Sequence, residues 1–151
     1  DPSVGGINYS LDSATLATWA LLSSASGGAA AFARGATNWD LWPRWTDDNT
    51  YWRVNQAAYE TNASTDARGW WHQTRTASNA SALYLNGTSV DSAATASNII
   101  QAGNIILLGD GASTWTPNQM AAAAFGAGMS ATEAGNLYTR LRTYMTAVGV
   151  P

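Results

Sequence analysis

Short hydrophobic runs alternate with polar, turn-rich segments along most of the chain. Runs with strand-like composition lie near residues 30–34, 39–45, 50–55, 70–76, 81–86, 104–109 and 120–126, and "ATWALL" at 17–22 is a further strand candidate. Clusters of Gly, Ser, Asn and Asp separate these runs, and such residues favour turns. Many short strands with turns between them are typical of an antiparallel β-sandwich.

One turn has an especially clear signature. Asn86–Gly87 lies between Leu83–Leu85 and the polar run 88–90. Asn-Gly suits a two-residue hairpin turn because both of its residues adopt positive φ readily. We therefore expect a tight β-hairpin centred on these two residues.

The hydrophobic period changes after residue 129. Ser130 and Glu133 have the S-x-x-E spacing of a capping box, which begins a helix. Apolar positions then recur at helical spacing, at Ala134, Leu137, Tyr138, Leu141, Met145 and Val148. Gly149 and Pro151 favour termination. This pattern predicts an amphipathic helix near 131–147.

This helix has an expected orientation. Leu137, Leu141 and Met145 should be buried against the sandwich, with Arg140 and Thr143 facing outward. We expect residues 1–151 to form a single domain, with a lead-in segment at 1–15 and a closing helix at 130–148.

The composition narrows the possible functions. Only 11% of the 151 residues are charged, and eight Trp and six Tyr stand against two Phe. Trp and Tyr combine an apolar ring with a polar group, which suits protein interfaces and sugar-binding surfaces as well as cores. The net charge is −3, all seven basic residues are Arg, and they form no cluster, which argues against nucleic-acid binding.

Other features bear on the setting of the chain. It has no cysteine, so disulfides and thiol chemistry are excluded. No apolar run approaches the length of a membrane span, so membrane insertion is not expected. The chain begins at Asp1 without an initiator Met or a signal peptide. We therefore expect a fragment or a processed piece of a longer chain.

Four segments resemble domains of a known type. "RGWWHQTRTASNASALYLNGTSV" (68–90) looks like the centre of a laminin-G-like, concanavalin A-like jelly-roll domain, and "NIILLGDG" (104–111) continues the match. "AAAFGAGMSATEAGNLYTRLRTYMTAVG" (122–149) and "LWPRWTDDNTYWRVN" (41–55) resemble related domains of tailed-phage and prophage proteins. The resemblance implies an all-β, antiparallel jelly-roll β-sandwich of concanavalin A-like type with one C-terminal amphipathic helix.

Catalytic patterns are weak. Glucanases of this fold carry closely spaced carboxylates on one strand, as in E-x-D-x-E. This chain has only two glutamates, Glu60 and Glu133, and neither has an acidic partner at strand spacing. His72 is the only histidine, and no G-x-S-x-G motif accompanies it. We therefore expect no enzymatic activity, and a structural role for His72.

The segment "NWDLWPRWTDDNTYWR" (38–53) is the strongest candidate for a site. In a regular strand Trp39 and Trp45 share one face and Trp42 takes the other, whereas polyproline II geometry around Pro43 places all three on one side. The second arrangement would make an aromatic rail for sugar stacking. The alternative is that most of the eight tryptophans lie in the core or in a subunit interface.

The candidate glycan-binding residues are Trp42, Arg44, Asp47, Asp48, Asn49, Trp52 and Trp115. Asp47, Asp48 and Asn49 also supply hard oxygen atoms in a turn, so calcium is an open possibility as a cofactor. Asp and Asn side chains that cap their own turn explain the same residues equally well. No other cofactor is expected.

The resemblance and the composition together imply a non-enzymatic module of a phage virion, such as a tail-fibre, spike or decoration element. It would attach the particle to a surface, including by binding a cell-surface polysaccharide. Its expected partners are further copies of itself in a homo-oligomer, or other virion proteins. Two alternatives stay open: a purely structural module of virion assembly, and a glycan-binding module that is secreted or displayed on a bacterial cell surface.

Overall fold

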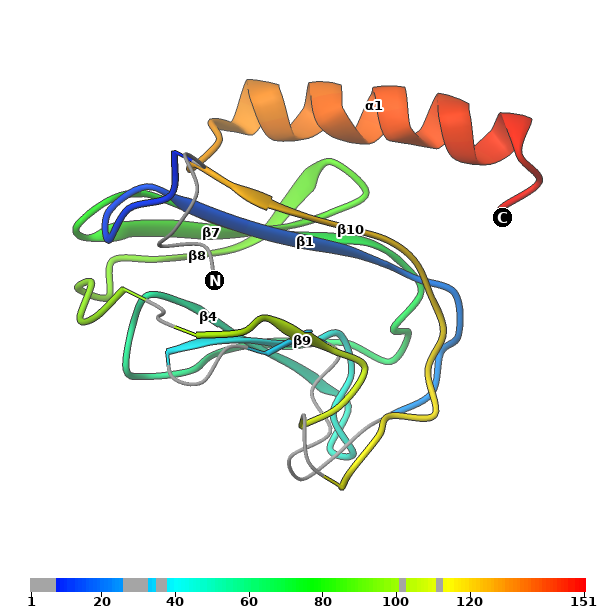
Figure 1. The fold of residues 1–151 in the computed structure, drawn as a ribbon, viewed down its shortest axis with the longest axis horizontal. Helices are drawn as coiled ribbons and strands as arrows, with labels where there is room; N and C mark the ends of the chain where they lie inside the picture. Colours follow the sequence, from blue (N-terminus) through cyan, green and yellow to red (C-terminus); the bar gives the residue numbers. More distant parts are fainter. Residues whose placement is uncertain (1–7, 26–32, 35–37, 101–102, 111–112) are drawn as a thin grey trace.

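The two halves of the fold are β-sheets that face each other, with one helix lying across the outside of the first sheet (Figure 1). This computed structural model describes residues 8–25, 33–34, 38–100, 103–110 and 113–151. The architecture is an antiparallel jelly-roll β-sandwich with one C-terminal helix, which confirms the expected fold class.

Within the described residues each sheet has five strands, and their pairings are all antiparallel. The first sheet has the order β10 (Met120–Gly126), β1 (Ala14–Ala20), β6 (Gly69–Ala77), β7 (Ala80–Leu85) and β8 (Thr88–Ala93). The second has the order β5 (Glu60–Ala63), β4 (Asn49–Val54), β3 (Trp39–Trp42), β2 (Ala33–Arg34) and β9 (Ile106–Leu107). The strands from β2 to β5 and from β6 to β8 each pair with their sequence neighbours, and β1 lies between β6 and β10.

The expected strands β4, β6, β7 and β10 are confirmed to within one residue at each end. The strand expected at 39–45 ends at Trp42, because Pro43 has no N–H to donate to a ladder. The strand expected at 104–109 contains only Ile106–Leu107. The strand near 17–22 begins earlier, at Ala14, and β5 forms between residues 56 and 69, a segment for which no strand was expected. Residues 30–32 of the strand expected at 30–34 lie outside the described residues.

The Asn86–Gly87 turn is confirmed. Both residues have positive φ, 52° and 78°, and the turn joins β7 to β8. These values match the two-residue turn type that follows the natural twist of a hairpin.

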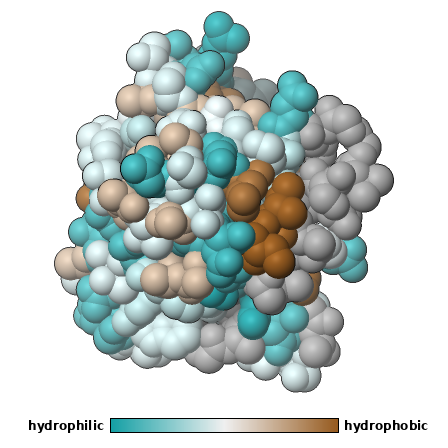
Figure 2. Space-filling view, turned by 90° about the vertical axis from the view of Figure 1, so that its left-hand side faces the viewer, coloured by the Kyte–Doolittle hydropathy of each residue, from teal (hydrophilic) through white to brown (hydrophobic). Residues whose placement is uncertain are grey.

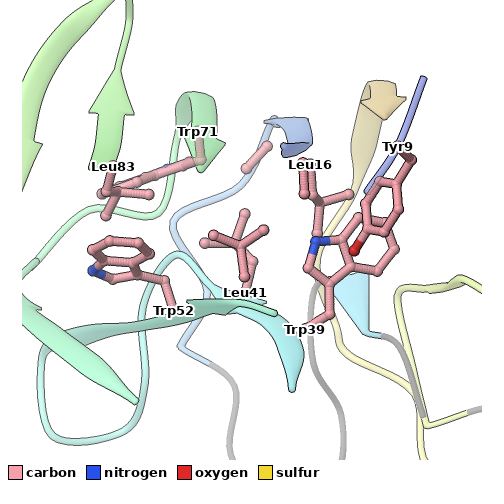
Figure 3. Close-up of a cluster of buried hydrophobic side chains, with 10 residues drawn as sticks. Tyr9, Leu16, Trp39, Leu41, Trp52, Trp71 and Leu83 are labelled. Atoms are coloured by element: carbon pink, nitrogen blue, oxygen red, sulfur yellow. The ribbon is translucent and has the colours of Figure 1, made fainter. Parts of the chain in front are cut away.

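The main core fills the space between the two sheets (Figure 3). Its large members are Tyr9, Leu16, Trp39, Leu41, Trp52, Trp71 and Leu83, all buried. Tyr9 belongs to the expected lead-in segment 1–15, yet its ring packs edge-on against Trp39 at 5.8 Å and its hydroxyl donates to Asn55 Oδ1. Residues ahead of the first strand therefore contribute to the core.

Helix α1 (Ala131–Ala147) begins and ends as expected. The Ser130 side chain accepts a hydrogen bond from the Glu133 N–H, and the Glu133 carboxylate accepts one from the Ser130 N–H. Gly149, with φ 79°, follows the C-cap residue Val148. Among the described residues, no helix combines the length and the apolar character needed to cross a membrane.

The helix builds a second hydrophobic cluster on the outer face of the first sheet. Met145 is buried there against Ala17, Trp19 and Trp70. Leu137 and Leu141 pack against this cluster but are only half-buried, so their full burial was overestimated. Arg140 and Thr143 face outward as expected. Val148, the last apolar position at helical spacing, is the C-cap residue and is 53% exposed.

These two clusters explain where most of the tryptophans lie. Trp39, Trp52 and Trp71 are between the sheets, and Trp19 and Trp70 are under the helix. With Trp42, six of the eight are buried, whereas Trp45 is half-buried and Trp115 is 65% exposed. Most of the tryptophans are therefore core residues.

Candidate functional site: an aromatic face on the open sheet

Alternation along β3 and β4 decides which side chains reach the outside of the second sheet. Trp39 and Leu41 point into the core, so Asp40 and Trp42 point outward. No described helix covers this outer surface, whereas α1 covers the outer surface of the other sheet (Figure 1).

Trp52 was wrongly expected to belong to a ligand-binding surface. It is fully buried in the core between the sheets, and its indole Nε1–H donates to Asp91 Oδ2 at 2.9 Å. Its neighbours Tyr51 and Arg53 take the opposite face, because successive strand residues alternate.

Four aromatic rings gather on the outer surface, which we call the aromatic face: Trp42, Trp45, Tyr51 and Tyr59. Trp42 contacts Trp45 at 5.3 Å and Tyr59 at 5.5 Å between ring centroids. Tyr51 contacts Trp45 at 5.5 Å and Tyr59 at 6.2 Å. Each ring therefore packs against two others, mostly edge to face, the geometry that aromatic pairs prefer.

The four rings differ in exposure. Trp42 is only 5% exposed and supports the others from below, so it is not the exposed stacking ring that the sequence suggested. Tyr59 is 40% exposed, and Trp45 and Tyr51 are half-buried. The accessible surface is therefore provided by Trp45, Tyr51 and Tyr59.

Neither geometry considered for the segment around Pro43 is fully correct. The strand alternative places Trp39 and Trp42 on opposite faces, as observed, but it places Trp45 with Trp39. The chain leaves the strand at Pro43 and turns, closed by the Trp45 N–H donating to the Asn49 carbonyl. Trp45 is thereby brought over Trp42.

A buried carboxylate anchors one side of the aromatic face. Asp40 is fully buried; Arg53 Nε donates to its Oδ2 at 2.6 Å, and Arg53 Nη2 lies 2.5 Å from the same oxygen in an ion pair. The Tyr59 hydroxyl donates to the same oxygen, and Arg34 lies 3.5 Å from Oδ1. The Arg53 guanidinium also sits 4.2 Å above the Tyr59 ring, a cation–π geometry. These contacts fix the position of Tyr59.

The turn at 47–49 anchors the other side. Asp47 Oδ1 accepts a hydrogen bond from the Asn49 N–H, an Asx turn, and Asp47 Oδ2 accepts one from the Tyr51 hydroxyl at 2.8 Å. Asp48 adopts φ 60° and pairs with Arg44 at 2.8 Å. Arg44 also donates to the Ser23 carbonyl. The candidates Arg44, Asp47, Asp48 and Asn49 therefore gather beside the aromatic face.

The same contacts bear on calcium. Both Asp47 oxygens and one Asp48 oxygen have protein donors, which fits the interpretation that these side chains cap their own turn. Within the described ranges, no three His, Cys, Asp or Glu side chains come together as a metal site. Calcium at this turn stays a prediction.

Hydrogen bonding also sets the protonation of these groups. Burial, followed by the negative charge of Asp40, raises the pKa of Tyr59 to about 12. The hydrogen bond to Asp47 raises the pKa of Tyr51. Desolvation alone would raise the pKa of Asp47, but hydrogen bonds from Tyr51 and Asn49 outweigh it and lower that pKa. The tyrosines stay neutral and Asp47 stays charged over the ordinary pH range.

Trp115 lies away from this group of residues. Its backbone forms an isolated β-bridge with Gly109, which lies two residues after the end of β9. Strand β9 is the edge strand of the second sheet opposite to β5. Among the described residues it makes no ring contact with the aromatic face. The structure therefore does not join Trp115 to Trp42.

The residues considered for catalysis lie apart. Glu60, on β5, accepts hydrogen bonds from Gln56 and Thr95, and Glu133 caps α1. His72 is fully buried, and burial lowers its pKa to about 4. Its Nε2 lies 3.3 Å from the Thr15 hydroxyl. A pair of facing carboxylates does not form from these residues.

Sequence reasoning missed Asp40, Arg53 and Tyr59. A usable signal was present, because a charged residue in an otherwise apolar strand marks the outward face. Asp40 shares that face with Trp42, and Arg53 shares it with Tyr51. Tyr59 had no such signal, since it precedes an unpredicted strand.

No family model matches the chain, and no curated protein matches it either. Solved structures do match in fold. The botulinum neurotoxin serotype D binding domain aligns with 88% of this chain and 39% of its own, at 13% identity and a TM-score of 0.54. Trypanosoma rangeli sialidase aligns with 87% of this chain and 23% of its own, at 13% identity and a TM-score of 0.57.

A third match is domain 4 of AbnA, a GH43 extracellular arabinanase from Geobacillus stearothermophilus, solved in complex with arabinotriose. It aligns with 84% of this chain and 66% of its own, at 15% identity and a TM-score of 0.57. The chain thus spans only part of each of these solved chains. At such identities the similarity establishes the β-sandwich fold.

Proposed function

We propose that this chain is a non-enzymatic carbohydrate-binding module whose aromatic face holds a neutral sugar chain. The observation that carries the proposal is the set of three accessible rings, Trp45, Tyr51 and Tyr59, fixed above a buried Trp42. Sugars present flat C–H surfaces that pack on aromatic rings, and rings already held in place lose little entropy on binding.

The polar neighbours suit the same ligand. Asp47, Arg44 and Asn49 border the rings, and Arg53 covers one side of Tyr59. Carboxylate, amide and guanidinium groups can exchange hydrogen bonds with sugar hydroxyls. The fold supports the proposal as well, because its solved neighbours include a toxin binding domain and an arabinotriose-bound domain.

The test is a panel of neutral polysaccharides, including arabinan, in affinity electrophoresis. We expect the chain to be retarded by at least one of them, and Tyr59→Ala to abolish the retardation. Tyr144→Ala is the matched control, since Tyr144 is a 60% exposed tyrosine on α1, on the other side of the sandwich. Retardation that survives Tyr59→Ala, or that Tyr144→Ala removes equally, would contradict the proposal.

We further propose that the module belongs to a phage virion protein, a tail fibre, spike or decoration element, and attaches it to a bacterial surface. The support is the resemblance of residues 41–55 and 122–149 to phage-associated domains. The purified chain should then bind intact bacterial cells of a suitable host. Binding that persists after enzymatic removal of the surface polysaccharide would speak against a glycan receptor.

A second candidate function, assembly with copies of itself, is favoured by the exposed hydrophobic side chains. Trp115 is 65% exposed and Leu107, on the edge strand β9, is 36% exposed. Figure 2 shows one hydrophobic patch on an otherwise mostly polar side of the molecule. Sedimentation should show an oligomer that Trp115→Ala weakens, whereas Trp42→Ala should act mainly on folding. A monomer at all concentrations would remove this candidate.

A further inference from the structure

A second surface feature lies on the helix side of the sandwich. A cleft of about 400 Å³ opens where α1, the end of β1, the start of β6 and the β7–β8 turn meet. Its principal lining residues are Trp19, Asp66, Arg68, Asn86, Tyr138 and Arg142. The volume falls in the range of small-molecule sites.

The floor and one wall of the cleft are aromatic. The Trp19 and Tyr138 rings stack with centroids 6.1 Å apart and planes 25° apart. Trp19 is also packed against Trp70, at 6.1 Å, beneath the helix. The half-buried Tyr138 ring therefore rests on a rigid base.

The charged side chains that line the cleft differ in whether they have an ion-pair partner. Arg68 donates to Asp66 through Nε at 3.0 Å and Nη2 at 2.6 Å, a two-pronged pair. This pair holds the pKa of Asp66 well below its ordinary value and raises that of Arg68. These two charges therefore largely neutralise each other.

Arg142 is different. Its guanidinium lies 5.8 Å from the Trp19 ring centroid, and within the part of the chain that the structure describes it makes no hydrogen bond or ion pair. The side chain is half-buried. A positioned guanidinium with unused donors is well suited to a carboxylate, which it can bind through two parallel hydrogen bonds.

The other polar groups limit the kind of anion. Asn86 Oδ1 accepts from the Trp70 N–H at 2.9 Å, so its Nδ2 group is left as a donor. The Asp66 carboxylate is 45% exposed and can accept hydrogen bonds from hydroxyls. Because Asp66 is already paired with Arg68, Arg142 supplies the one positive charge left without an ion pair among the described residues that line the cleft. A single negative charge on the ligand would balance it. The set favours a singly charged ligand that also carries hydroxyl groups.

We infer that this cleft is a second binding site, separate from the aromatic face, for a carboxylate-bearing sugar of the hexuronate class. The sugar carboxylate pairs with Arg142. Its hydroxyls bond to Asp66 and Asn86, and its ring lies beside Tyr138. Gly69 leaves space around the Asn86 side chain at one end of the cleft, because a Cβ on Gly69 would lie 2.8 Å from Asn86 Oδ1.

The test is an NMR titration of the whole chain with D-glucuronate, and with neutral D-glucose as the ligand control. Glucuronate should shift the signals of Trp19, Asn86 and Arg142 in a saturable way, without shifting the indole signal of Trp45. Glucose should produce no saturable shift at these residues. Saturable shifts confined to other residues, no saturable shift with glucuronate, or equal shifts with glucose would overturn the proposal.

Three variants sharpen the result. Arg142→Gln should weaken glucuronate binding by about tenfold or more, as expected for a lost charged hydrogen-bonded pair. Arg140→Gln removes the same charge from the same helix, but Arg140 does not line this cleft, so its affinity should match the parent. Equal losses of glucuronate affinity in Arg142→Gln and Arg140→Gln would mean that binding depends on the overall charge of the helix, and would contradict a site at Arg142. Trp45→Ala should leave glucuronate binding intact, which keeps this test independent of the aromatic face.

Discussion

The two outer faces of the sandwich differ in how far they are covered by the rest of the chain. The outer face of the first sheet carries Ala17, Trp19 and Trp70 and is covered by α1, so its rings are buried. The outer face of the second sheet carries the aromatic face, which no described helix covers. Its rings cover one another and remain partly accessible.

The difference follows from residue type. Under the helix the large residues are Trp and Met, which gain from complete removal from water. On the open face the outermost rings include two tyrosines, and their hydroxyls bond to Asp40 and Asp47. Such rings tolerate water at one end and an apolar partner at the other. A covered face therefore serves stability, and an open face of this kind suits recognition.

The largest expected effect belongs to the covered face. Met145→Ala should lower the free energy of unfolding by about 2–5 kcal/mol, because the side chain is buried against Trp19 and Trp70 and its loss leaves a cavity. Leu141→Ala should cost less, since Leu141 is only half-buried. Chemical denaturation provides the values.

Thr143→Ala is the control on the same helix, because Thr143 is exposed. It should change stability by no more than about 0.5 kcal/mol. A Met145→Ala protein as stable as the parent would show that α1 does not dock on the sheet, and the contrast between the faces would fail.

His72, also on the covered face, makes stability depend on pH. Burial lowers its pKa from 6.5 to about 4, so the unfolded chain binds a proton more readily than the folded one between these values. Stability is complete above pH 6.5 and falls as the pH drops toward 4, by on the order of 3 kcal/mol.

Urea unfolding of the parent and of His72→Gln at several pH values tests this. The variant should lose the part of the pH dependence that lies between pH 6.5 and 4. Identical pH profiles would mean that His72 is accessible to water and protons in the folded state.

A smaller loss of stability than those predicted for Met145→Ala and for His72 protonation is expected on the open face. Tyr59→Phe removes the hydroxyl that donates to Asp40 at 2.9 Å but keeps the ring. Because Tyr59 is 40% exposed, the loss should be about 1 kcal/mol. Sugar binding should persist, since the ring surface is retained. Loss of binding in this variant would mean that the hydroxyl, and not the ring, recognises the ligand.

Much of the fold could be predicted because local signals agreed with tertiary structure. The capping box at Ser130 and Glu133 and the Asn86–Gly87 turn are decided by backbone chemistry within a few residues. β5 could not be found in this way, because its sequence, Glu60 to Ala63, is polar and half-exposed at a sheet edge. Its pairing with the preceding strand β4 overrides its weak strand propensity.

The candidate site could be predicted only in part. The segment 38–53 does supply most of the aromatic face, but Trp52 and Trp42 were assigned to the surface although both are buried. Strand parity separates Tyr51 from Trp52, and a shift of one residue exchanges the faces. Tyr59 joins the site through contacts with rings up to seventeen residues earlier in the chain, which no local pattern encodes.

The most direct test of the central claim is isothermal titration calorimetry of Trp45→Ala with the oligosaccharide that binds the parent best. Loss of this ring should weaken binding by about 1 kcal/mol or more, roughly fivefold to tenfold, as for other aromatic contacts. Trp115→Ala, which removes the exposed tryptophan beyond β9, should bind like the parent. Unchanged affinity in Trp45→Ala, with a loss in Trp115→Ala, would contradict the assignment of sugar binding to the aromatic face.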